Sequence, residues 1–372
     1  MKIKNFIIPF VLLGLFLNLA FSPCTITAAK MKQEEEKDKA QERVIIPEEV
    51  KTALQQGIAQ RLGRQDIPFR IIKHLHLPAR ENTHSIFLFK IKNVDMGFVP
   101  LPSPPDQKKP EEAAEEKKEM PPAAQTETPA VQLQTSLNAF LQFHRLEDKE
   151  PVEVFKEVYI PINFQADSTS YDPEKEEVYS TAYPLSPGDY LLAMAITSLD
   201  LQKIGTLYFE FSLPDTSLFT DKLDTTPIFF VKEFKQMASP ETTAEVHKDF
   251  FTYAVLQVAP KIESVFSPGE KLDILYYIFG TQPGEDGKFD IGVNYEVLKD
   301  EEKIIRFQPI TYPNPFVSQP LPMKKTVIIK SEEEGEKKEP KDLEPGAYTL
   351  SVKIKDNVSG KSLTKEINFE VK

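Results

Sequence analysis

The chain has 372 residues, of which 40% are hydrophobic and 27% are charged, a balance typical of globular proteins long enough for two domains. Its net charge of −12 disfavours nucleic acid and anionic membrane surfaces as partners. Proline, with 31 residues, outnumbers glycine, with 14, which favours strands that end in stiff turns and argues against long helices.

Residues 1–29 have the pattern of a signal peptide. Lys2 and Lys4 precede a nearly unbroken apolar run over residues 6–20, and the small residues Ala28 and Ala29 are plausible cleavage sites. The run is short for a membrane-spanning helix, which needs roughly twenty residues. The mature protein is therefore expected to be secreted or periplasmic, without a membrane span.

Cys24 is the only cysteine, and it lies just after the apolar run, where a lipoprotein carries its acylated cysteine. Lipoprotein signals usually end in a small residue, whereas Pro23 precedes this cysteine, so cleavage near Ala28 without a lipid anchor is the favoured interpretation. Cleavage at that point leaves a mature chain with neither a thiol nor a disulfide.

Two elements are expected before the first domain. Residues 30–45 form a charge run without apolar periodicity, which predicts a disordered spacer. Residues 46–65 predict a short helix, because Pro47 suits the first turn and apolar residues then follow at every fourth position. These apolar residues are Val50, Leu54, Ile58 and Leu62.

Residues 66–215 predict a first β-sandwich, since apolar and polar residues alternate in several short runs separated by turn residues. Strands are expected over 69–77, 85–92, 137–148, 154–164, 177–183, 189–198 and 205–213. Residues 100–130 are rich in Pro, Glu, Lys and Ala and nearly lack other apolar residues, which predicts a disordered insertion inside this sandwich.

Residues 216–249 are interpreted as a connector with one strand-like run over 228–234, and residues 250–372 as a second β-sandwich. Strands of the second sandwich are expected over 251–259, 271–279, 288–298, 303–310, 324–330, 347–355 and 362–371. The turn residues between these runs are those of antiparallel hairpins.

One pattern occurs in both predicted sandwiches, which indicates a tandem repeat. Leu-x-Pro-Gly-x-Tyr-x-Leu is found at residues 185–192 and again at 343–350. In each copy a Pro-Gly turn leads into a strand whose apolar residues alternate. The fold class predicted from these observations is all-β, with two antiparallel sandwiches, a short N-terminal helix and an insertion in the first sandwich.

The repeated pattern resembles the corner before strand F in immunoglobulin-like and fibronectin type III sandwiches. The resemblance implies that the hydroxyls of Tyr190 and Tyr348 bond to backbone a few residues upstream and form two structural tyrosine corners. The last third of the chain, with its turn at 356–361, also resembles the sandwich beside GWxTD domains of uncharacterised secreted bacterial proteins. The chain contains no tryptophan and so lacks the GWxTD motif itself. These resemblances imply an architecture but no activity.

The sharpest candidate for chemistry is a pair of histidines, His74 and His76, which share one face of a predicted strand. Glu81 and His84 lie nearby in the sequence, and imidazole nitrogens suit transition metals. The alternative interpretation is two histidines at the solvated edge of a strand, because no further ligand stands at a diagnostic spacing. A calcium loop around Glu285 is disfavoured, since a hairpin turn explains its Asp-Gly pair.

Nucleophilic catalysis has little support in the sequence. The Gly-x-Ser-x-Gly pattern of serine hydrolases is absent, and the only cysteine lies in the signal region. The expected protein is therefore not an enzyme and needs no cofactor. Its expected role is a non-catalytic binding or structural module of the bacterial cell envelope, which contacts other envelope proteins through loops or sheet edges. Two alternatives remain open: a metal-binding envelope protein that uses His74 and His76, and a carbohydrate-binding accessory module.

Overall fold

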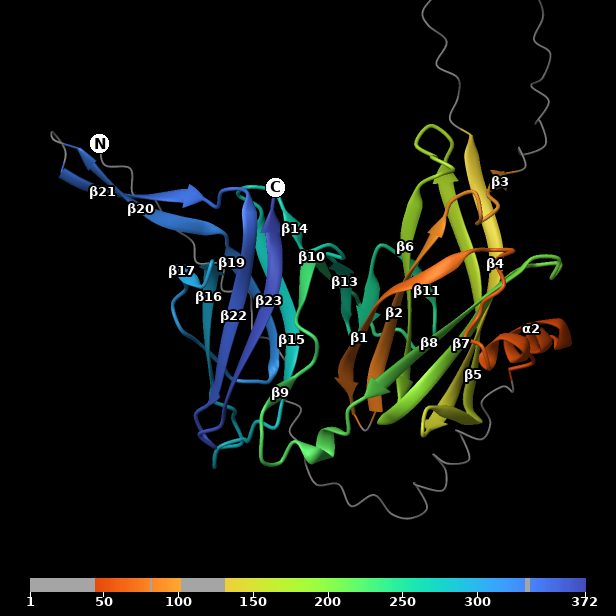
Figure 1. Ribbon diagram of the computed structural model, residues 1–372, viewed down its shortest axis with the longest axis horizontal. Helices are drawn as coiled ribbons and strands as arrows, with labels where there is room; N and C mark the ends of the chain where they lie inside the picture. The colour runs from red at the N-terminus through yellow and green to blue at the C-terminus, as the bar shows by residue number, and fades with distance from the viewer. Residues whose placement is uncertain (1–43, 81, 102–130, 332–334) are drawn as a thin grey trace, which may run out of the picture. The chain divides into compact units, whose positions relative to one another are not determined.

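The computed structural model describes residues 44–372, apart from residues 81, 102–130 and 332–334; the side chains of residues 327–338 are not described either. The described part of the chain is built mostly of strands, with one α-helix, α2 (Glu48–Ile58), and one 3₁₀ turn, η1 (Thr216–Leu218) (Figure 1). The predicted signal peptide, nearly all of the predicted spacer and all but the start of the predicted insertion lie outside the described residues.

Two antiparallel sheets enclose the first apolar core. Sheet I has the strand order β1 (Phe69–Ala79), β2 (Asn82–Lys92), β6 (Glu176–Leu185) and β11 (Val246–Lys248). Sheet II has the order β5 (Glu150–Asp167), β4 (Gln132–Glu147), β7 (Gly188–Ser198) and β8 (Ile204–Leu213), with β3 (Val99–Pro100) paired to β4. Alternate residues of β2 and β4, among them Phe87, Phe89 and Phe143, meet in this core. The period-two pattern of the sequence thus directs one face of each sheet inward.

Two further sheets enclose the second core. Sheet III has the order β12 (Phe251–Tyr253), β13 (Leu256–Pro260), β10 (Phe229–Gln236), β15 (Lys271–Phe279) and β19 (Phe316–Pro322), with β9 (Asp224–Thr225) paired to β15. Sheet IV has the order β17 (Glu302–Arg306), β16 (Ile291–Lys299), β22 (Gly346–Asp356), β23 (Ser362–Val371) and β14 (Val265–Phe266), with β18 (Ile310–Tyr312) paired to β16. Strands β20 (Lys324–Ser331) and β21 (Gly335–Asp342) form a separate hairpin. All pairings are antiparallel except that of β14 with β23.

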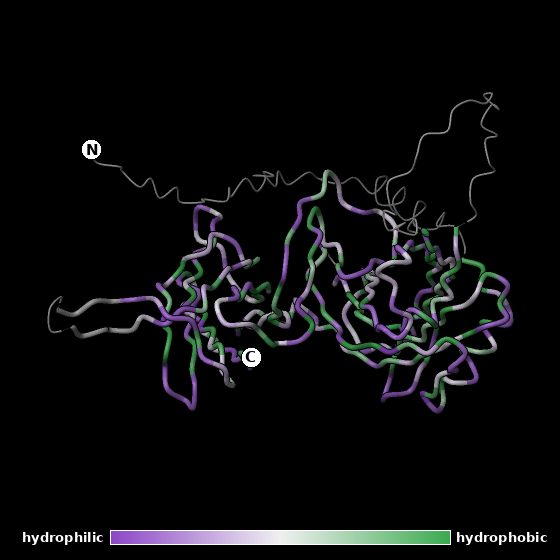
Figure 2. Tube along the Cα trace, turned by 90° about the horizontal axis from the view of Figure 1, so that it is seen from above, coloured by the Kyte–Doolittle hydropathy of each residue, from purple (hydrophilic) through white to green (hydrophobic). Residues whose placement is uncertain are grey.

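A third apolar cluster joins sheet I to sheet III. Its members are Leu75, Leu77, Ile86, Leu88, Phe229, Val231, Phe251, Val258 and Leu275. Residues 86–89 of β2 are therefore fully buried on both faces of sheet I. Such double burial is the reason for the uninterrupted apolar run of this strand, in contrast with the half-exposed strands of an ordinary sandwich. Figure 2 shows apolar residues gathered along the strands and hydrophilic ones in many of the loops.

Helix α2 packs on β7 and β8, against the face of sheet II that points away from the core (Figure 1). Val50, Ala53 and Leu54 are buried there, and the Tyr208 hydroxyl donates to the carbonyl of Leu54 at 2.7 Å. The helix is shorter than the predicted range of 46–65. It ends at Ile58, and the chain turns at Arg61, which has a φ of 53°, so that the backbone N–H of Leu62 donates to the carbonyl of Gly57 at 3.3 Å.

The segment expected to be a connector, residues 216–249, contributes strands to both sheet pairs. Strand β10 lies between β13 and β15 in sheet III, and β11 pairs with β6 at the edge of sheet I. The strand expected over 251–259 is instead the hairpin of β12 and β13, which turns next to Ala254, with a φ of 50°. The chain therefore passes between the two sheet pairs more than once.

The two Pro-Gly-x-Tyr corners adopt matching geometries. The hydroxyl of Tyr190 donates to the carbonyl of Ser186 at 2.8 Å, and the hydroxyl of Tyr348 donates to the carbonyl of Glu344 at 2.6 Å. Both rings are buried, in the first and second cores respectively. Burial raises the pKa of Tyr190, which keeps its hydroxyl protonated as a donor.

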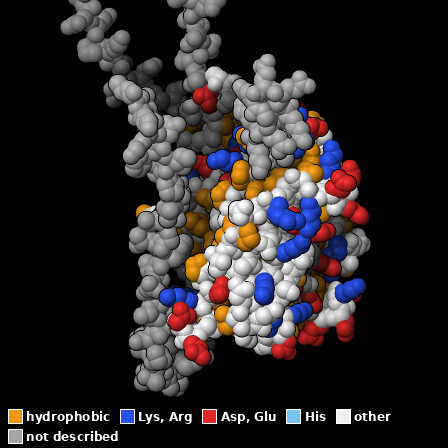
Figure 3. Space-filling model, turned by 90° about the vertical axis from the view of Figure 1, so that its left-hand side faces the viewer, with side chains coloured by type: hydrophobic (Ala, Val, Ile, Leu, Met, Phe, Trp, Pro, Cys, Tyr) orange, Lys and Arg blue, Asp and Glu red, His pale blue; other side chains and the backbone are white. Residues whose placement is uncertain are grey.

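The outer face of sheet IV carries a charge network centred on Glu296. Glu296 is almost fully buried. Its Oε2 atom lies 2.7 Å from the Nζ atom of Lys353, and its Oε1 atom lies 3.1 Å from the Nζ atom of Lys303 and 3.3 Å from the Nε atom of Arg306. The hydrogen bond from Lys353 is the main cause that holds the pKa of Glu296 below its usual value. Figure 3 shows basic and acidic side chains close together on one side of the molecule.

Candidate functional site

Strand β5 presents the longest unpaired edge among the strands of sheet II. It spans Glu150–Asp167, and in the described residues it pairs with β4 only. An edge strand leaves a row of backbone donors and acceptors free, and this makes it a template for a further strand. The other side of sheet II ends at β8, which is ten residues long.

Exposed apolar side chains are concentrated on β5. Of the twelve large hydrophobic side chains that are exposed in the described residues, four lie on this strand: Val152, Val154, Phe155 and Tyr159. Val152 is 56% exposed and Tyr159 is 45% exposed. We call these four residues the β5 edge. Single exposed apolar residues are ordinary on a protein surface, but their concentration on one edge strand makes β5 the candidate contact surface of the described residues.

Arg145 anchors the beginning of the β5 edge. Its guanidinium lies 4.6 Å from the centre of the Phe155 ring and 4.5 Å from that of Tyr190. The same group donates to the carbonyl of Pro187 at 2.7 Å and to the hydroxyl of Ser186 at 2.5 Å. Phe155 is thus exposed but held in place, so the β5 edge is preorganised for contact at this end.

His74 and His76 lie on β1, with ring centres 6.0 Å apart. The Nε2 atom of His74 is 2.7 Å from the hydroxyl of Ser85, and its ring packs on Phe87 and Phe211. Burial lowers the pKa of His74 to about 3, and His76 adds a smaller effect in the same direction. Burial also lowers the pKa of His76 to about 4, against a weaker opposing effect of Asp224. Both rings are neutral at physiological pH.

The metal site predicted at these histidines gains no third ligand from the described residues. Glu81 is not described, and the Nε2 atom of His84 lies 3.0 Å from the carbonyl of Thr252. The one group of three converging His, Asp, Glu or Cys ligands that the described residues form includes neither His74 nor His76. The two imidazoles therefore line an aromatic cluster with Ser85 as the polar neighbour of His74.

A cavity of about 600 Å³ lies where η1, β9 and the end of β8 meet β23. His76 lines it, and so do Asp224 and Lys365, whose charged groups are 2.8 Å apart. Phe219 and Phe279 stack at its wall. The lining combines apolar side chains with this ion pair and the carboxylate of Glu366, which suits a small ligand that is mostly apolar. Lys365 and Asp224 offset each other's charge, and Glu366 adds a further negative charge to the lining.

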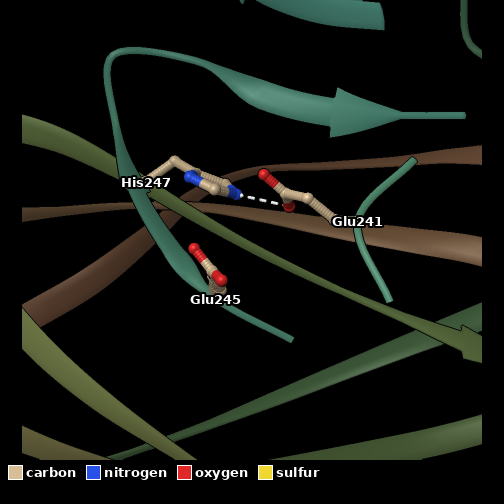
Figure 4. A group of neighbouring side chains, drawn as sticks. All are labelled: Glu241, Glu245 and His247. Carbon is tan, nitrogen blue, oxygen red and sulfur yellow. Dashed lines mark hydrogen bonds and ion pairs between the residues drawn. The ribbon is translucent and has the colours of Figure 1, made fainter. Parts of the chain in front are cut away.

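The described residues bring together one group that the sequence did not reveal: Glu241, Glu245 and His247 (Figure 4). The Nε2 atom of His247 lies 2.9 Å from a carboxylate oxygen of Glu241. Glu241 belongs to the segment between β10 and β11, and His247 belongs to β11. Their short sequence spacing was a possible signal, but the segment has no apolar periodicity that predicts its conformation.

No family model matches the chain, and no curated protein matches it. Within the described residues, no helix is long and apolar enough to cross a membrane.

Proposed function

We propose that the protein is a non-catalytic binding component of the bacterial cell envelope, which contacts another protein through the β5 edge. The observation that supports this most directly is the combination of a long edge strand, unpaired on one side among the described residues, with four exposed apolar side chains. Backbone groups of such an edge give affinity to an added strand, and alternate side chains give selectivity. The proposed location is the periplasm or the cell exterior, in line with the signal pattern of residues 1–29.

We propose in addition that the two sheet pairs are immunoglobulin-like sandwiches related by duplication. The strand orders support this: β1-β2-β6 faces β5-β4-β7-β8, and β10-β15-β19 faces β17-β16-β22-β23. These orders correspond one to one along the chain. The hairpins after β4 and β16 also turn in the same way, because Asp148 and Lys149 have positive φ, as do Asp300 and Glu301.

Photo-crosslinking in the native organism tests the proposed contact. A photoreactive amino acid replaces Val152 in one variant, Tyr159 in a second and Val358 in a control, since Val358 is exposed on the turn after β22. The expected result is one discrete adduct shared by the first two variants and missing from the control. The adduct partner is then purified, and its affinity for the wild type is compared with that for Val154→Lys.

Lysine on an edge strand opposes strand addition, so Val154→Lys is expected to weaken binding at least tenfold without a change in melting temperature. Adducts that are the same at Val152 and Val358, or full affinity of the lysine variant, contradict the proposal.

A carbohydrate-binding role is the second candidate, because Phe155 and Tyr159 expose aromatic rings on the same strand. Glycan-array binding that is lost in Tyr159→Ala and retained in Val154→Lys would favour it over a protein partner.

A further inference from the structure

Three potential metal ligands converge at β11, the last strand of sheet I. Glu245 directly precedes this strand, His247 lies within it, and Glu241 reaches them from the preceding segment (Figure 4). One ligand atom from each residue lies within 4.8 Å of the other two, and the closest pair is the Nε2 atom of His247 and a carboxylate oxygen of Glu241, 2.9 Å apart. In a tetrahedral zinc site, with bonds of about 2.1 Å, ligand atoms lie about 3.4 Å apart. The closest pair is shorter than that value, and the upper limit of 4.8 Å for the other pairs leaves room for it.

Two of the three ligands are already held in place. The hydroxyl of Thr252 donates to the carboxylate oxygen of Glu241 that also contacts His247, at 2.7 Å. The His247 ring stacks on Phe250 with ring centres 4.6 Å apart, and only 11% of this side chain is exposed. Such outer contacts orient ligands before an ion binds and raise the affinity of the site. Glu245 is exposed, so its carboxylate can rotate to complete the set.

The donor set indicates the class of ion. Two carboxylates and one neutral imidazole carry a charge of −2, which matches a divalent cation. Imidazole nitrogen suits zinc and other transition metals, whereas calcium and magnesium prefer an all-oxygen set. A metal ion binds the unprotonated Nε2 atom of His247, so it would take the place that this nitrogen's contact with Glu241 now occupies.

We propose that Glu241, Glu245 and His247 bind a divalent transition-metal ion, with Zn²⁺ as the representative, and that water completes the coordination. The site would connect the two sheet pairs: His247 lies on β11 of sheet I, while Thr252, which orients Glu241, lies on β12 of sheet III. Bound metal is then expected to stabilise the junction between sheets I and III. This proposal is independent of the β5 edge, which belongs to sheet II.

Calorimetric titration of chelator-treated protein, produced without a histidine tag, tests the site. Zn²⁺ is expected to bind with one ion per chain, and the melting temperature is expected to rise with its concentration. Glu245→Gln and His247→Gln are expected to weaken Zn²⁺ binding at least tenfold. The matched control is Glu285→Gln, which removes an exposed carboxylate from a turn of the second sheet pair and should leave the affinity unchanged.

Co²⁺ provides a second readout, because its visible absorption intensifies when it enters a tetrahedral protein site. This readout does not depend on the thermal stability of the variants. The intense band is expected in the wild type and in Glu285→Gln, and its loss is expected in His247→Gln. The proposal is overturned if the wild type binds no Zn²⁺, if all three variants bind equally, or if Ca²⁺ binds and Zn²⁺ does not.

Discussion

Arg145 and Tyr190 are cross-strand partners of β4 and β7, and the guanidinium of the first lies over the ring of the second. The second sheet pair repeats the relationship in a looser form, since Lys299 lies over Tyr348 at 5.5 Å from the ring centre. Arg145 also bonds to Ser186 and Pro187, the residues that form the corner. Two contacts thus hold the start of β7 in place: the guanidinium of Arg145 over the Tyr190 ring, and the hydrogen bond from the Tyr190 hydroxyl to the carbonyl of Ser186.

Arg145→Ala is expected to lower the free energy of unfolding by about 2–3 kcal/mol, because it removes two charged hydrogen bonds and a stacked cation. Lys299→Ala is the matched control in the second sheet pair, and about 0.5 kcal/mol is expected for its longer contact. Urea denaturation measures both. Equal losses in the two variants would contradict this account of the corner.

Removal of the tyrosine hydroxyls tests the corners themselves. Tyr190→Phe and Tyr348→Phe keep the buried rings and delete the hydrogen bond to the upstream carbonyl, so each is expected to cost about 1 kcal/mol. Tyr190→Phe also deletes a longer contact of 3.2 Å with the hydroxyl of Ser186. Tyr159→Phe deletes a hydrogen bond to Asn138 at the exposed β5 edge and is expected to cost less than about 0.5 kcal/mol. Urea denaturation at pH 7.5 provides the comparison. If Tyr348→Phe leaves the free energy of unfolding unchanged, a structural role for that corner is contradicted.

The cluster between sheets I and III is expected to couple the unfolding of the two sheet pairs. The intact protein should show one calorimetric unfolding transition. Leu88→Ala opens a cavity in the shared cluster, so it should lower the free energy of unfolding by about 2–5 kcal/mol and divide the transition into two. Leu350→Ala, in the second core alone, is the control. It is expected to destabilise the protein by a similar amount, without the separation.

The partly buried histidines His74 and His76 make stability depend on pH. The pKa values of His74 and His76 are lowered to about 3 and about 4 in the folded chain, while an unfolded histidine titrates near 6.5. Between these values the unfolded chain binds more protons, so the stability contributed by the neutral rings is complete above pH 6.5 and decreases as the pH falls toward 4. Urea denaturation at pH 7.5 and pH 5.0 should show this loss. His74→Leu is expected to reduce it by an amount on the order of 2 kcal/mol, and an unchanged pH dependence would contradict the burial of this ring.

The sequence predicted those elements whose pattern is local. Strands β7, β15, β22 and β23 lie within a residue of their expected bounds, because alternation and Pro-Gly turns specify them without reference to the rest of the chain. Strand β19 was not predicted, since Pro320 and Pro322 argue against a strand. It tolerates them because it lies at the edge of sheet III and pairs only with β15.

Features that depend on tertiary contacts could not be predicted in the same way. The close approach of Gly57 in α2 to the ring of Tyr208 joins residues that are distant in sequence. The convergence of Glu241 with His247 depends on the pairing of β11 with β6, in a segment without an apolar pattern. The pair His74 and His76 was visible in the sequence, but the aromatic neighbours that bury these rings come from β2 and β8.

Because β2 is covered on both sides, the chain cannot be divided into two independently soluble halves. A fragment cut after β8 would expose Leu75, Leu77, Ile86 and Leu88 to water and would also lack β11, so it should precipitate or self-associate when expressed alone. Each sheet pair is therefore expected to need the other for its solubility, and an unrelated module in place of either would need a new surface that covers this cluster.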